Sequence, residues 1–292
     1  MSILVTGSTG RIGTEIISQL AKSGEKINAL TRSPKKATFP AGVTAVGGDL
    51  LDADAMRQAL NGVKTLFLLV SNAPDELTQA INTLGLARDV GVQGIVYLSV
   101  ARSEEFTDVA HFTGKFAVER MIEQLDLPAT ILRPSYFFQN DVLQKEPLLN
   151  AGLYVSPVGN KGVSMVDVRD IADAAVIELI RRHRSTRPLP REIYELSGPD
   201  SLTGQGLAAI WAQALDRDVS YAGNDLDTFE QNIKAHAPAW KAYDMRAMMR
   251  RYQTDGAVAP QADIARLTDL LGRAPRNYRD FALETARQWK AK

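Results

Sequence analysis

The sequence lacks cysteine altogether and contains only three histidines, at positions 111, 183 and 236. Without cysteine the protein has no disulfide, no thiolate nucleophile and no thiol-based redox sensor, which fits a cytoplasmic location. The histidines are too far apart in the chain to form a His-x-x-x-His pair or another zinc-binding pattern, so we expect no metal site.

Neither sign of charge is in excess, because 34 lysines and arginines balance 34 aspartates and glutamates. A chain of zero net charge has no general attraction to nucleic acid or to an anionic membrane surface. Long apolar runs are absent too, since no stretch reaches the ~20 residues of a membrane-spanning helix. The opening residues MSILVTGSTG lack the basic start of a signal peptide. We therefore expect neither nucleic acid nor membrane as a partner.

Two catalytic motifs are also missing. The sequence contains no G-x-S-x-G nucleophile elbow, which argues against an α/β serine hydrolase. The glycine-rich turn near its beginning lacks the Lys-Ser/Thr pair of a P-loop, which argues against nucleotide hydrolysis.

The first half of the 292-residue chain alternates short β-branched apolar runs with segments of helical periodicity. Ile12, Ile16 and Leu20 form one helical stripe, and Asp52 is placed to cap the next helix. Strands that are apolar throughout, separated by helices, indicate a parallel sheet covered on both faces. The predicted fold class is α/β, a Rossmann-type doubly wound parallel sheet with a smaller, mostly helical second lobe. The expected strands are 3–5, 27–30, 43–46, 65–70, 95–100, 129–132 and 192–198.

The alternation loosens after about residue 133, where prolines and glycines become frequent. We predict that residues 1–133 and about 160–182 form the Rossmann domain, and that 134–159 and 183–292 form the smaller lobe. Within this part, 163–180 is interpreted as a short strand followed by a helix capped near Asp167 or Asp170. The basic segment 181–191 is interpreted as a solvated connection, since zero net charge does not favour a nucleic-acid patch.

A turn of pattern G-x-x-G-x-x-G, residues 7–13, joins the first expected strand to the first expected helix. In that context the pattern is typical of dinucleotide binding. Gly7 permits a tight turn, Gly10 lets the backbone approach a pyrophosphate, and Gly13 lets the helix lie close to the sheet. Phosphate then lies at the helix N-terminus, where free N–H groups and the dipole favour negative charge. The alternative is a glycine-rich turn without a ligand.

The choice between NAD and NADP depends on the end of the second strand, about 20 residues further on. An acid there binds the ribose 2′-hydroxyl, whereas this sequence has Arg32, with Lys35 and Lys36 nearby. The planar guanidinium matches a 2′-phosphate, so we predict NADP(H) in preference to NAD(H). The alternative interpretation is a solvated basic turn.

The chain resembles the NmrA-like family of atypical short-chain dehydrogenase/reductase proteins. The matching segments are VTGSTGRIG, LTRS, GGDLLD, HFTGKFAVE, ILRPSYFFQN, VSMVDVRDIADAAV, YELSGPDSLT and LLGRAPRNYRDF, which together span nearly the whole chain. That group includes NADPH-dependent quinone reductases, triphenylmethane dye reductases and non-catalytic redox-sensing regulators. The resemblance implies the fold and a nicotinamide cofactor, and it leaves the substrate open.

The resemblance also implies roles for individual residues. Most of them fall at expected strand ends, in agreement with ligand binding at the carboxyl ends of parallel strands. The implied cofactor-binding residues are Gly7, Ser8, Thr9, Gly10, Arg11, Ile12 and Gly13 at the phosphates, Arg32 at the 2′-phosphate, Asp49 and Leu50 at the adenine, Val70, Ser71, Ser99 and Val100 towards the ribose and nicotinamide, Lys115 at the nicotinamide ribose, and Pro134, Ser135, Tyr136 and Phe137 along the nicotinamide.

One departure from the wider superfamily affects the expected chemistry. Typical members carry Tyr-x-x-x-Lys, in which the tyrosine exchanges a proton with the substrate oxygen, whereas this chain has HFTGK, with His111 at the tyrosine position and Lys115 retained. A histidine titrates near neutral pH and can donate a proton. The candidate catalytic residues are therefore His111, Lys115 and Tyr136. The alternatives are a histidine without a chemical role and a solvated helix lysine.

Two apolar groups have both a structural and a functional interpretation. Tyr136, Phe137 and Phe138 either fill the core of the second lobe or form an aromatic wall for the nicotinamide and a flat substrate. The methionines within 243–252 share helical spacing with Tyr252, which is typical of core packing. A flexible lid over a hydrophobic pocket is the alternative.

The leading hypothesis is an NADPH-dependent oxidoreductase that transfers hydride to a hydrophobic conjugated acceptor such as a quinone or dye. Such acceptors delocalise the incoming charge, so orientation and a dry apolar pocket matter more than a tyrosine acid. A second hypothesis is a non-catalytic NADP(H) sensor that acts through a protein partner. A third is an NADPH-dependent reductase or isomerase of a carbonyl or enone metabolite. Formation of a homodimer stays open.

Overall fold

The structure is a computed structural model that describes residues 1–291, and its main feature is a seven-stranded sheet in the order β3-β2-β1-β4-β5-β6-β8. The pairs from β3 to β6 are all parallel. This arrangement confirms the predicted α/β Rossmann-type fold. The strands are β1 (Ser2–Val5), β2 (Ile27–Thr31), β3 (Val43–Gly47), β4 (Val63–Leu68), β5 (Gly94–Leu98), β6 (Ala129–Pro134) and β8 (Glu192–Leu196).

Tertiary contacts divide the chain into two compact units. Unit 1 comprises Met1–Ser103, Gly114–Arg133 and Arg169–Tyr194. Unit 2 comprises Glu104–Thr113, Pro134–Val168 and Glu195–Lys292. Each unit is therefore assembled from segments that are separated in the sequence.

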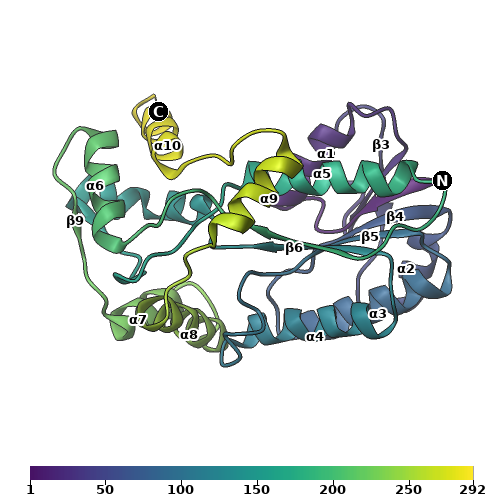
Figure 1. Cartoon of the computed structure of the whole chain (residues 1–292), viewed down its shortest axis with the longest axis horizontal. Coiled ribbons are helices and arrows are strands. Elements are labelled where there is room, and N and C mark those ends of the chain that lie inside the picture. Colours follow the sequence, from purple (N-terminus) through teal and green to yellow (C-terminus); the bar gives the residue numbers. More distant parts are fainter. Residues whose placement is uncertain (292) are drawn as a thin grey trace. The chain divides into compact units, whose positions relative to one another are not determined.

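Helices cover both faces of the sheet in unit 1. On one face lie α2 (Ala53–Leu60), α3 (Glu76–Asp89) and α4 (Ala110–Gln124), and on the other lie α1 (Arg11–Leu20) and α5 (Val168–Arg184) (Figure 1). Every residue of β1, β5 and β6 is buried. Burial on both sides explains why these strands are apolar or β-branched along almost their whole length.

The cap predicted for α2 is present. The Asp52 side chain accepts hydrogen bonds from the backbone N–H groups of Asp54 and Ala55, both at 3.0 Å. These bonds satisfy two of the donors that the first turn of a helix leaves unpaired. Met56 and Leu60 then face the core as fully buried side chains.

The prediction that 181–191 is a solvated connection is wrong at its start. Helix α5 continues to Arg184, and the Arg182 side chain is fully buried. Its guanidinium donates to Thr130 Oγ1 at 2.7 Å and to two backbone carbonyls of the following segment, and the Glu178 carboxylate lies 3.9 Å away. Because Glu178 precedes Arg182 by one helical turn, this pairing compensates part of the cost of burying the charge.

The short strand expected at the start of 163–180 is replaced by isolated bridges at Val163 and Val166. Helix α5 then begins at Val168, directly after the buried Asp167. One oxygen of Asp167 accepts a hydrogen bond from Gln139 Nε2 at 2.9 Å. The aspartate thus lies where the predicted cap was expected and also contacts a neighbouring segment.

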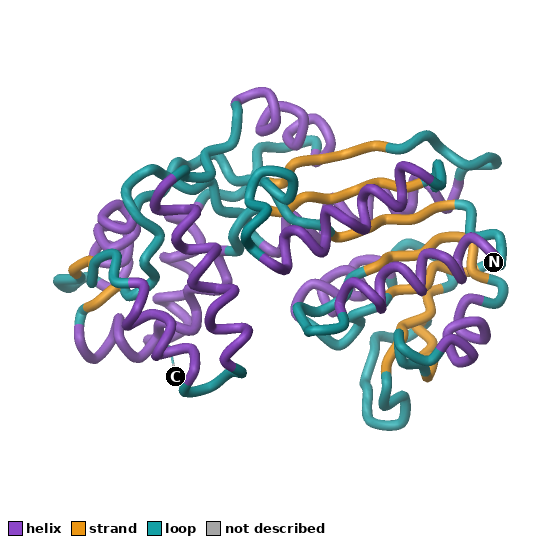
Figure 2. Tube along the Cα trace, turned by 90° about the horizontal axis from the view of Figure 1, so that it is seen from below, coloured by secondary structure: helices purple, strands orange, loops and turns teal. Residues whose placement is uncertain are grey.

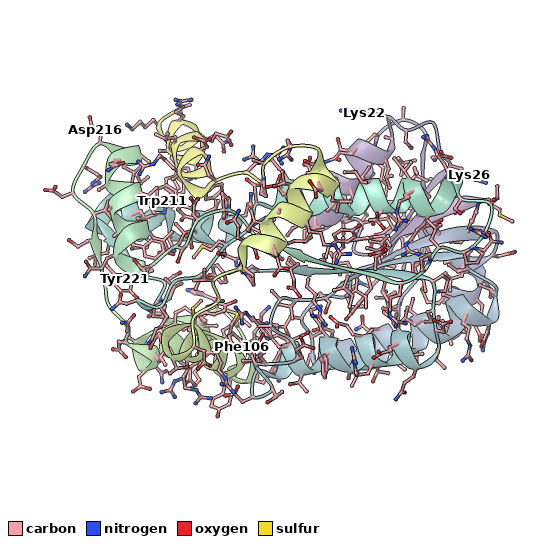
Figure 3. All side chains as sticks on the ribbon, viewed as in Figure 1. Lys22, Lys26, Phe106, Trp211, Asp216 and Tyr221 are labelled. Atoms are coloured by element: carbon pink, nitrogen blue, oxygen red, sulfur yellow. The ribbon has the colours of Figure 1, made fainter. Side chains whose placement is uncertain are left out.

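Unit 2 is mostly helical (Figure 2). Trp211, labelled in Figure 3, stacks on Trp289 with ring centroids 5.1 Å apart, and its Nε1 donates to the Tyr278 hydroxyl at 2.9 Å. These contacts fasten α6 (Gly204–Leu215) to α10 (Tyr278–Lys290). The elements of unit 2 are the short helices η1 (Phe138–Gln144) and η2 (Pro147–Ala151), the strands β7 (Leu153–Tyr154) and β9 (Ser220–Tyr221), and the helices α6 (Gly204–Leu215), α7 (Leu226–Lys234), α8 (Ala239–Thr254), α9 (Gln261–Leu271) and α10 (Tyr278–Lys290).

A carboxylate, Asp141, is fully buried in unit 2. It accepts hydrogen bonds from the Tyr154 hydroxyl at 3.0 Å, from Gln144 Nε2 at 2.7 Å and from the Tyr278 hydroxyl. Burial raises the pKa of Asp141 to about 6, while the three hydrogen bonds act in the opposite direction by stabilising the ionised form. The ionised carboxylate therefore makes the fold less stable than the protonated acid does.

We expect Asp141 to make stability depend on pH. Because its pKa is higher in the folded protein than the ordinary 3.8, the free energy of unfolding falls as the pH rises from 3.8 to about 6. The fall amounts to about 2 kcal/mol across this range and about 3 kcal/mol over the complete titration. Urea unfolding across this range, compared between wild type and Asp141→Asn, measures the effect. The variant, which cannot titrate at this position, is expected to lose that part of the slope, and an identical slope in both proteins would contradict the assignment.

Candidate functional site

The turn 7–13 follows β1 and leads into α1 with a geometry that requires glycine. Gly7 has a φ of 59°, a conformation that residues with a side chain rarely adopt. A Cβ added to Gly13 would collide with the Gly7 carbonyl oxygen and lie 2.8 Å from its carbonyl carbon. The missing side chain therefore allows the first turn of α1 to touch the backbone at the end of β1.

The N-terminus of α1 is suited to an anion. Gly10 occupies the cap position without a capping side chain, and the first turn contains no acidic residue. Thr9, Gly10 and Arg11 are exposed there. The N–H groups of a first turn carry the positive end of the helix dipole, so the arrangement fits a pyrophosphate held by backbone donors.

Ser8 and Thr6 connect this turn to its neighbours. The Ser8 hydroxyl is buried and donates to the carbonyl of Leu30 at 2.5 Å, so it fixes the turn to β2. Thr6 Oγ1 donates to the carbonyl of Leu69 and accepts from its N–H, both at 2.8 Å. These bonds lie where the strand order reverses between β1 and β4, the place where α/β sheets bind ligands.

Strands β4 and β5 end at Leu68 and Leu98, two residues before the predicted ends. The residues assigned to the cofactor therefore lie just beyond the strands. Val70 and Ser99 are buried, Ser71 is exposed and Val100 is half-buried. The carboxyl edge of the sheet still supplies this set of residues.

The predicted adenosine side lies at the ends of β2 and β3. Arg32 is the first residue after β2, and its side chain is exposed. Asp49 and Leu50 follow β3 and are half-buried, and one Asp49 oxygen accepts from the Leu51 N–H at 3.0 Å. The position and exposure of Arg32 fit a 2′-phosphate ligand.

Lys115 is not the solvated helix lysine of the alternative interpretation. Its Nζ lies 2.6 Å from Oε1 of Glu76, at the start of α3, and the two side chains are only 12% and 10% exposed. The two groups form an ion pair by distance, but they are not aligned as a hydrogen bond. Within the described residues, Oε1 of Glu76 therefore has no hydrogen-bond partner. Glu76 therefore holds the ammonium group in place and keeps capacity to accept a further hydrogen bond.

A buried ion pair lies beside the end of β5. Glu119 of α4 is fully buried and accepts from Arg133 through Nε at 3.1 Å and through Nη2 at 2.6 Å. Ser99 Oγ donates to the same carboxylate. The hydroxyl of Ser99 is thus engaged within unit 1, and its orientation depends on the Glu119–Arg133 pair.

His111, in the first turn of α4, pairs with Asp244 of α8 within unit 2. The Nδ1 atom lies 2.5 Å from one carboxylate oxygen, and the backbone N–H of His111 donates to the other at 3.3 Å. The side chains are 12% and 4% exposed. The imidazole is therefore held by a specific partner and is not a histidine that merely faces water.

The aromatic run after β6 divides between core and surface of unit 2. Phe138 is fully buried, whereas Tyr136 and Phe137 are half-buried. Tyr136 meets Tyr252 of α8 edge to face, with centroids 6.0 Å apart. Burial, together with the charge of Asp141, raises the pKa of the Tyr136 phenol far above its usual value. Tyr136 is consequently a weak proton donor.

The methionine stripe of α8 is mainly core, as the structural interpretation predicts. Met248, Met249 and Tyr252 are buried, and Met245 is half-buried. Phe106, labelled in Figure 3, lies against Tyr252 with centroids 6.1 Å apart.

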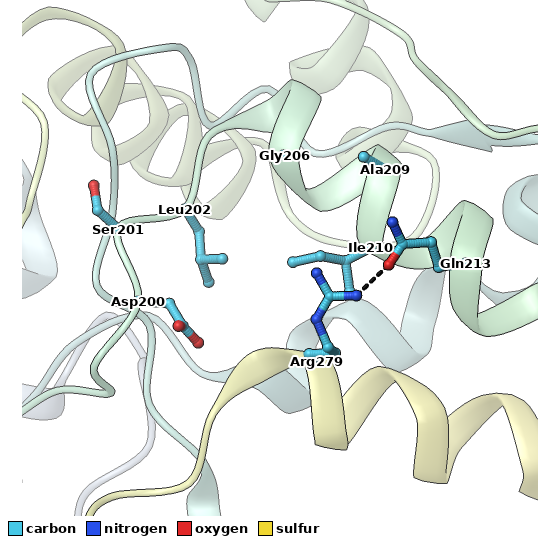
Figure 4. A pocket seen from close by; sticks show the side chains of 8 residues that line it. All are labelled: Asp200, Ser201, Leu202, Gly206, Ala209, Ile210, Gln213 and Arg279. Atoms are coloured by element: carbon cyan, nitrogen blue, oxygen red, sulfur yellow. Dashed lines mark hydrogen bonds between the residues drawn. The ribbon is translucent and has the colours of Figure 1, made fainter.

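A depression of about 390 Å³ lies in unit 2 between the segment 200–202 and helices α6 and α10 (Figure 4). It contains none of the predicted site residues. Arg279 donates to Gln213 across it, and Asp200 accepts from the backbone N–H of Tyr278 at 3.0 Å, so both charged groups already have partners. The residues that line it are Asp200, Ser201, Leu202, Gly206, Ala209, Ile210, Gln213 and Arg279.

Residues 1–291 contain neither a metal-binding cluster nor a membrane-spanning helix. No group of three or more histidine, aspartate or glutamate residues there is arranged to hold a metal ion. No helix in the same range has the length and apolar character to cross a membrane.

Sequence reasoning missed Glu76, Glu119, Asp244 and Asp141, four acids that the fold buries. Asp244 lies in a segment that was interpreted from its methionines, and its partner His111 is 133 residues away. A buried acid next to a basic residue of distant sequence position leaves no local pattern.

Comparison with known proteins connects this geometry to a family. The NmrA-like family matches residues 1–282. A (4-alkanoyl-5-oxo-2,5-dihydrofuran-3-yl)methyl phosphate reductase of Streptomyces griseus is 30% identical over 289 residues, covering 97% of this chain and 98% of the relative. The NAD(P)H azoreductase of Xenophilus azovorans is 27% identical over 288 residues, 96% of each chain.

A solved structure shares the whole fold. The NADPH-dependent quinone oxidoreductase of Escherichia coli, complexed with NADPH, superposes with a TM-score of 0.84 and covers 99% of both chains at 23% identity. At that identity the likeness shows the fold.

The collision at Gly13 gives a test of the turn. We expect Gly13→Ala to displace α1 from the turn, to lower stability by roughly 1–3 kcal/mol and to weaken NADPH binding at least about tenfold. Calorimetric titration with NADPH and urea unfolding measure the two effects. Gly85→Ala is the matched control, since a Cβ there meets nothing within 4 Å and α3 gains a better helix former. Unchanged NADPH affinity in Gly13→Ala would disprove the role of the turn.

Proposed function

The chain belongs to the NmrA-like family, and we propose that it is an NAD(P)H-dependent oxidoreductase that reduces a hydrophobic, conjugated acceptor such as a quinone or azo dye. The observation that carries the proposal is the uncapped N-terminus of α1 against the side-chain-free Gly13, which fits a dinucleotide pyrophosphate. The full-length relatives that are named as reductases support the reaction class.

The residues of unit 1 have distinct tasks in this proposal. Backbone N–H groups of 7–13 bind the pyrophosphate, and Lys115, held by Glu76, binds the nicotinamide ribose hydroxyls. The bound reduced nicotinamide supplies a hydride. Ser99, oriented by Glu119, and Val100 line the nicotinamide side.

NADP(H) is the cofactor that the charges favour. Arg32 is exposed at the end of β2, and the acid nearest to it on the preceding segment, Glu25, is bound by Arg184 at 2.8 Å. Glu25 also precedes the start of β2, at the opposite end of the strand from Arg32, so it does not compete for the ribose. An arginine in the position where NAD-binding proteins carry an acid matches a 2′-phosphate and not a 2′-hydroxyl.

The acceptor is assigned to unit 2 because of its aromatic residues. Tyr136 and Phe137 are only half-buried, and Tyr252, on the same helix as the α8 methionines, packs edge to face against Tyr136. A flat conjugated ring gains contact area on such side chains. Delocalisation of the incoming charge in the acceptor removes the need for the tyrosine acid that HFTGK lacks.

The function is tested by following NADPH oxidation with menadione, an azo dye and a triphenylmethane dye. We expect turnover above the non-enzymatic rate with at least one of them. Tight NADPH binding without turnover of any acceptor would overturn the proposal and favour the non-catalytic sensor. Turnover confined to carbonyl or enone substrates would favour the metabolite reductase.

Cofactor preference has its own test in Arg32→Ala. Loss of a charge-assisted contact of about 1.5–3 kcal/mol raises the KM for NADPH roughly 10- to 100-fold. The KM for NADH is expected to stay within about twofold, because NADH has no 2′-phosphate. Lys22→Ala is the control, because it removes an exposed cation of the same unit. Lys22 lies just after the C-terminus of α1, at the end away from the glycine turn (Figure 3). Equal losses for both nucleotides in Arg32→Ala would exclude the proposed contact.

A further inference from the structure

Asp244 makes two contacts with a single residue of unit 2. One of its carboxylate oxygens is 2.5 Å from His111 Nδ1, and the other accepts the backbone N–H of His111 at 3.3 Å. The second contact also satisfies a donor in the first turn of α4. A carboxylate engaged in both ways fixes the position of the residue and the rotation of its ring.

The contact determines which nitrogen is free. A carboxylate accepts hydrogen bonds and does not donate them, so Nδ1 has to carry the proton of the short contact. In the neutral ring Nε2 is then the unprotonated nitrogen, and in the charged ring it is the second donor. Proton exchange with another molecule therefore falls to Nε2, as in other carboxylate–histidine pairs.

The neighbouring charged and aromatic groups do not take the place of Asp244 as the partner of His111. Asp108 precedes α4, and Arg250 and Arg251 of α8 bind it at 2.9 and 2.6 Å, so these three charges pair with one another. Phe112 offers only its ring to the imidazole, edge to face at 4.7 Å.

We infer that Asp244 is the positioning residue for His111 and that His111 Nε2 donates the proton that completes reduction of the acceptor. This inference rests on the proposed function. Hydride addition to a quinone or an azo dye leaves an anion on an oxygen or nitrogen of the acceptor. The Nε2–H bond of the charged ring breaks, an O–H or N–H bond forms on the acceptor, and the ring recovers its proton from water. The sum is one hydride and one proton added to the acceptor.

The tyrosines of the same unit fit this assignment. Burial raises the pKa of both Tyr136 and Tyr252 well above the ordinary value of 10.0, so their phenols release a proton less readily than an ordinary tyrosine. An imidazole is suited to exchange near neutral pH. Of the catalytic candidates, His111 is thus the proton donor, and Lys115 keeps its binding role.

The pairing is tested first on the wild-type protein without cofactor. Nitrogen-15 spectra of histidine-labelled protein report the protonation of each ring nitrogen, and with only three histidines the His111 signals are assigned by their loss in His111→Gln. We expect Nδ1 to stay protonated across the titration while Nε2 gains and loses its proton. A neutral ring protonated at Nε2 would overturn the inference whether or not the protein has reductase activity.

Asp244→Asn provides the kinetic test. Its amide keeps the shape and an oxygen for the His111 N–H, but it no longer requires a proton on Nδ1. We expect kcat with a quinone or an azo dye as acceptor to fall about 10- to 100-fold, while the KM for NADPH stays within about twofold. Asp255→Asn, at the end of the same helix, removes a surface carboxylate and is the matched control.

The double variant separates positioning from a general structural effect. In a His111→Gln background, Asp244→Asn is expected to change kcat less than about twofold, because the residue on which it acts is gone. Full additivity of the two substitutions, or equal kcat values in Asp244→Asn and Asp255→Asn, would refute the inference. Absence of turnover in the wild type would refute the proposed function alone, since the nitrogen spectra still decide the pairing.

Discussion

The close contact between Gly13 and the carbonyl of Gly7 is the constraint on which the proposed cofactor site depends. It allows the first turn of α1 to begin directly at the carboxyl end of β1, so the free N–H groups of the helix face the same edge as the ends of the neighbouring strands. Ser8 and Thr6 then attach this turn to β2 and to the segment after β4. The geometry of the turn is therefore fixed by backbone contacts and two hydroxyls, without any charged side chain.

The buried cations of unit 1 are each paired with an acid of the protein itself. Lys115 has Glu76, Arg133 has Glu119, and Arg182 has Glu178. An unpaired charge at these depths would cost several kcal/mol, so each buried cation requires its acid. The pairs also restrict side-chain motion, which reduces the ordering that ligand binding would otherwise demand.

The sequence was sufficient for the parallel sheet with its flanking helices, the glycine turn and the cap at Asp52, because all three depend on local periodicity and on residues with special backbone properties. The buried acids could not be predicted, since Asp244 meets His111 and Glu76 meets Lys115 only after the chain has folded. The burial of Arg182 could not be predicted either. Arg182 belongs to a run of basic residues, which suggests exposure, and its burial depends on Thr130, 52 positions earlier. Contacts between residues that are far apart in the sequence cannot be predicted from local composition.

The stacked tryptophans have a practical consequence for studying this protein. All three tryptophans, Trp211, Trp240 and Trp289, belong to unit 2, and two of them form the stacked pair between α6 and α10. Unit 1 contains none, although it carries the glycine turn and Arg32. Tryptophan fluorescence, excited selectively above the absorption of tyrosine, therefore reports the environment of the helical unit alone. Agreement between fluorescence and circular dichroism during denaturation would thus measure whether the two units unfold together, in a protein that needs no added label.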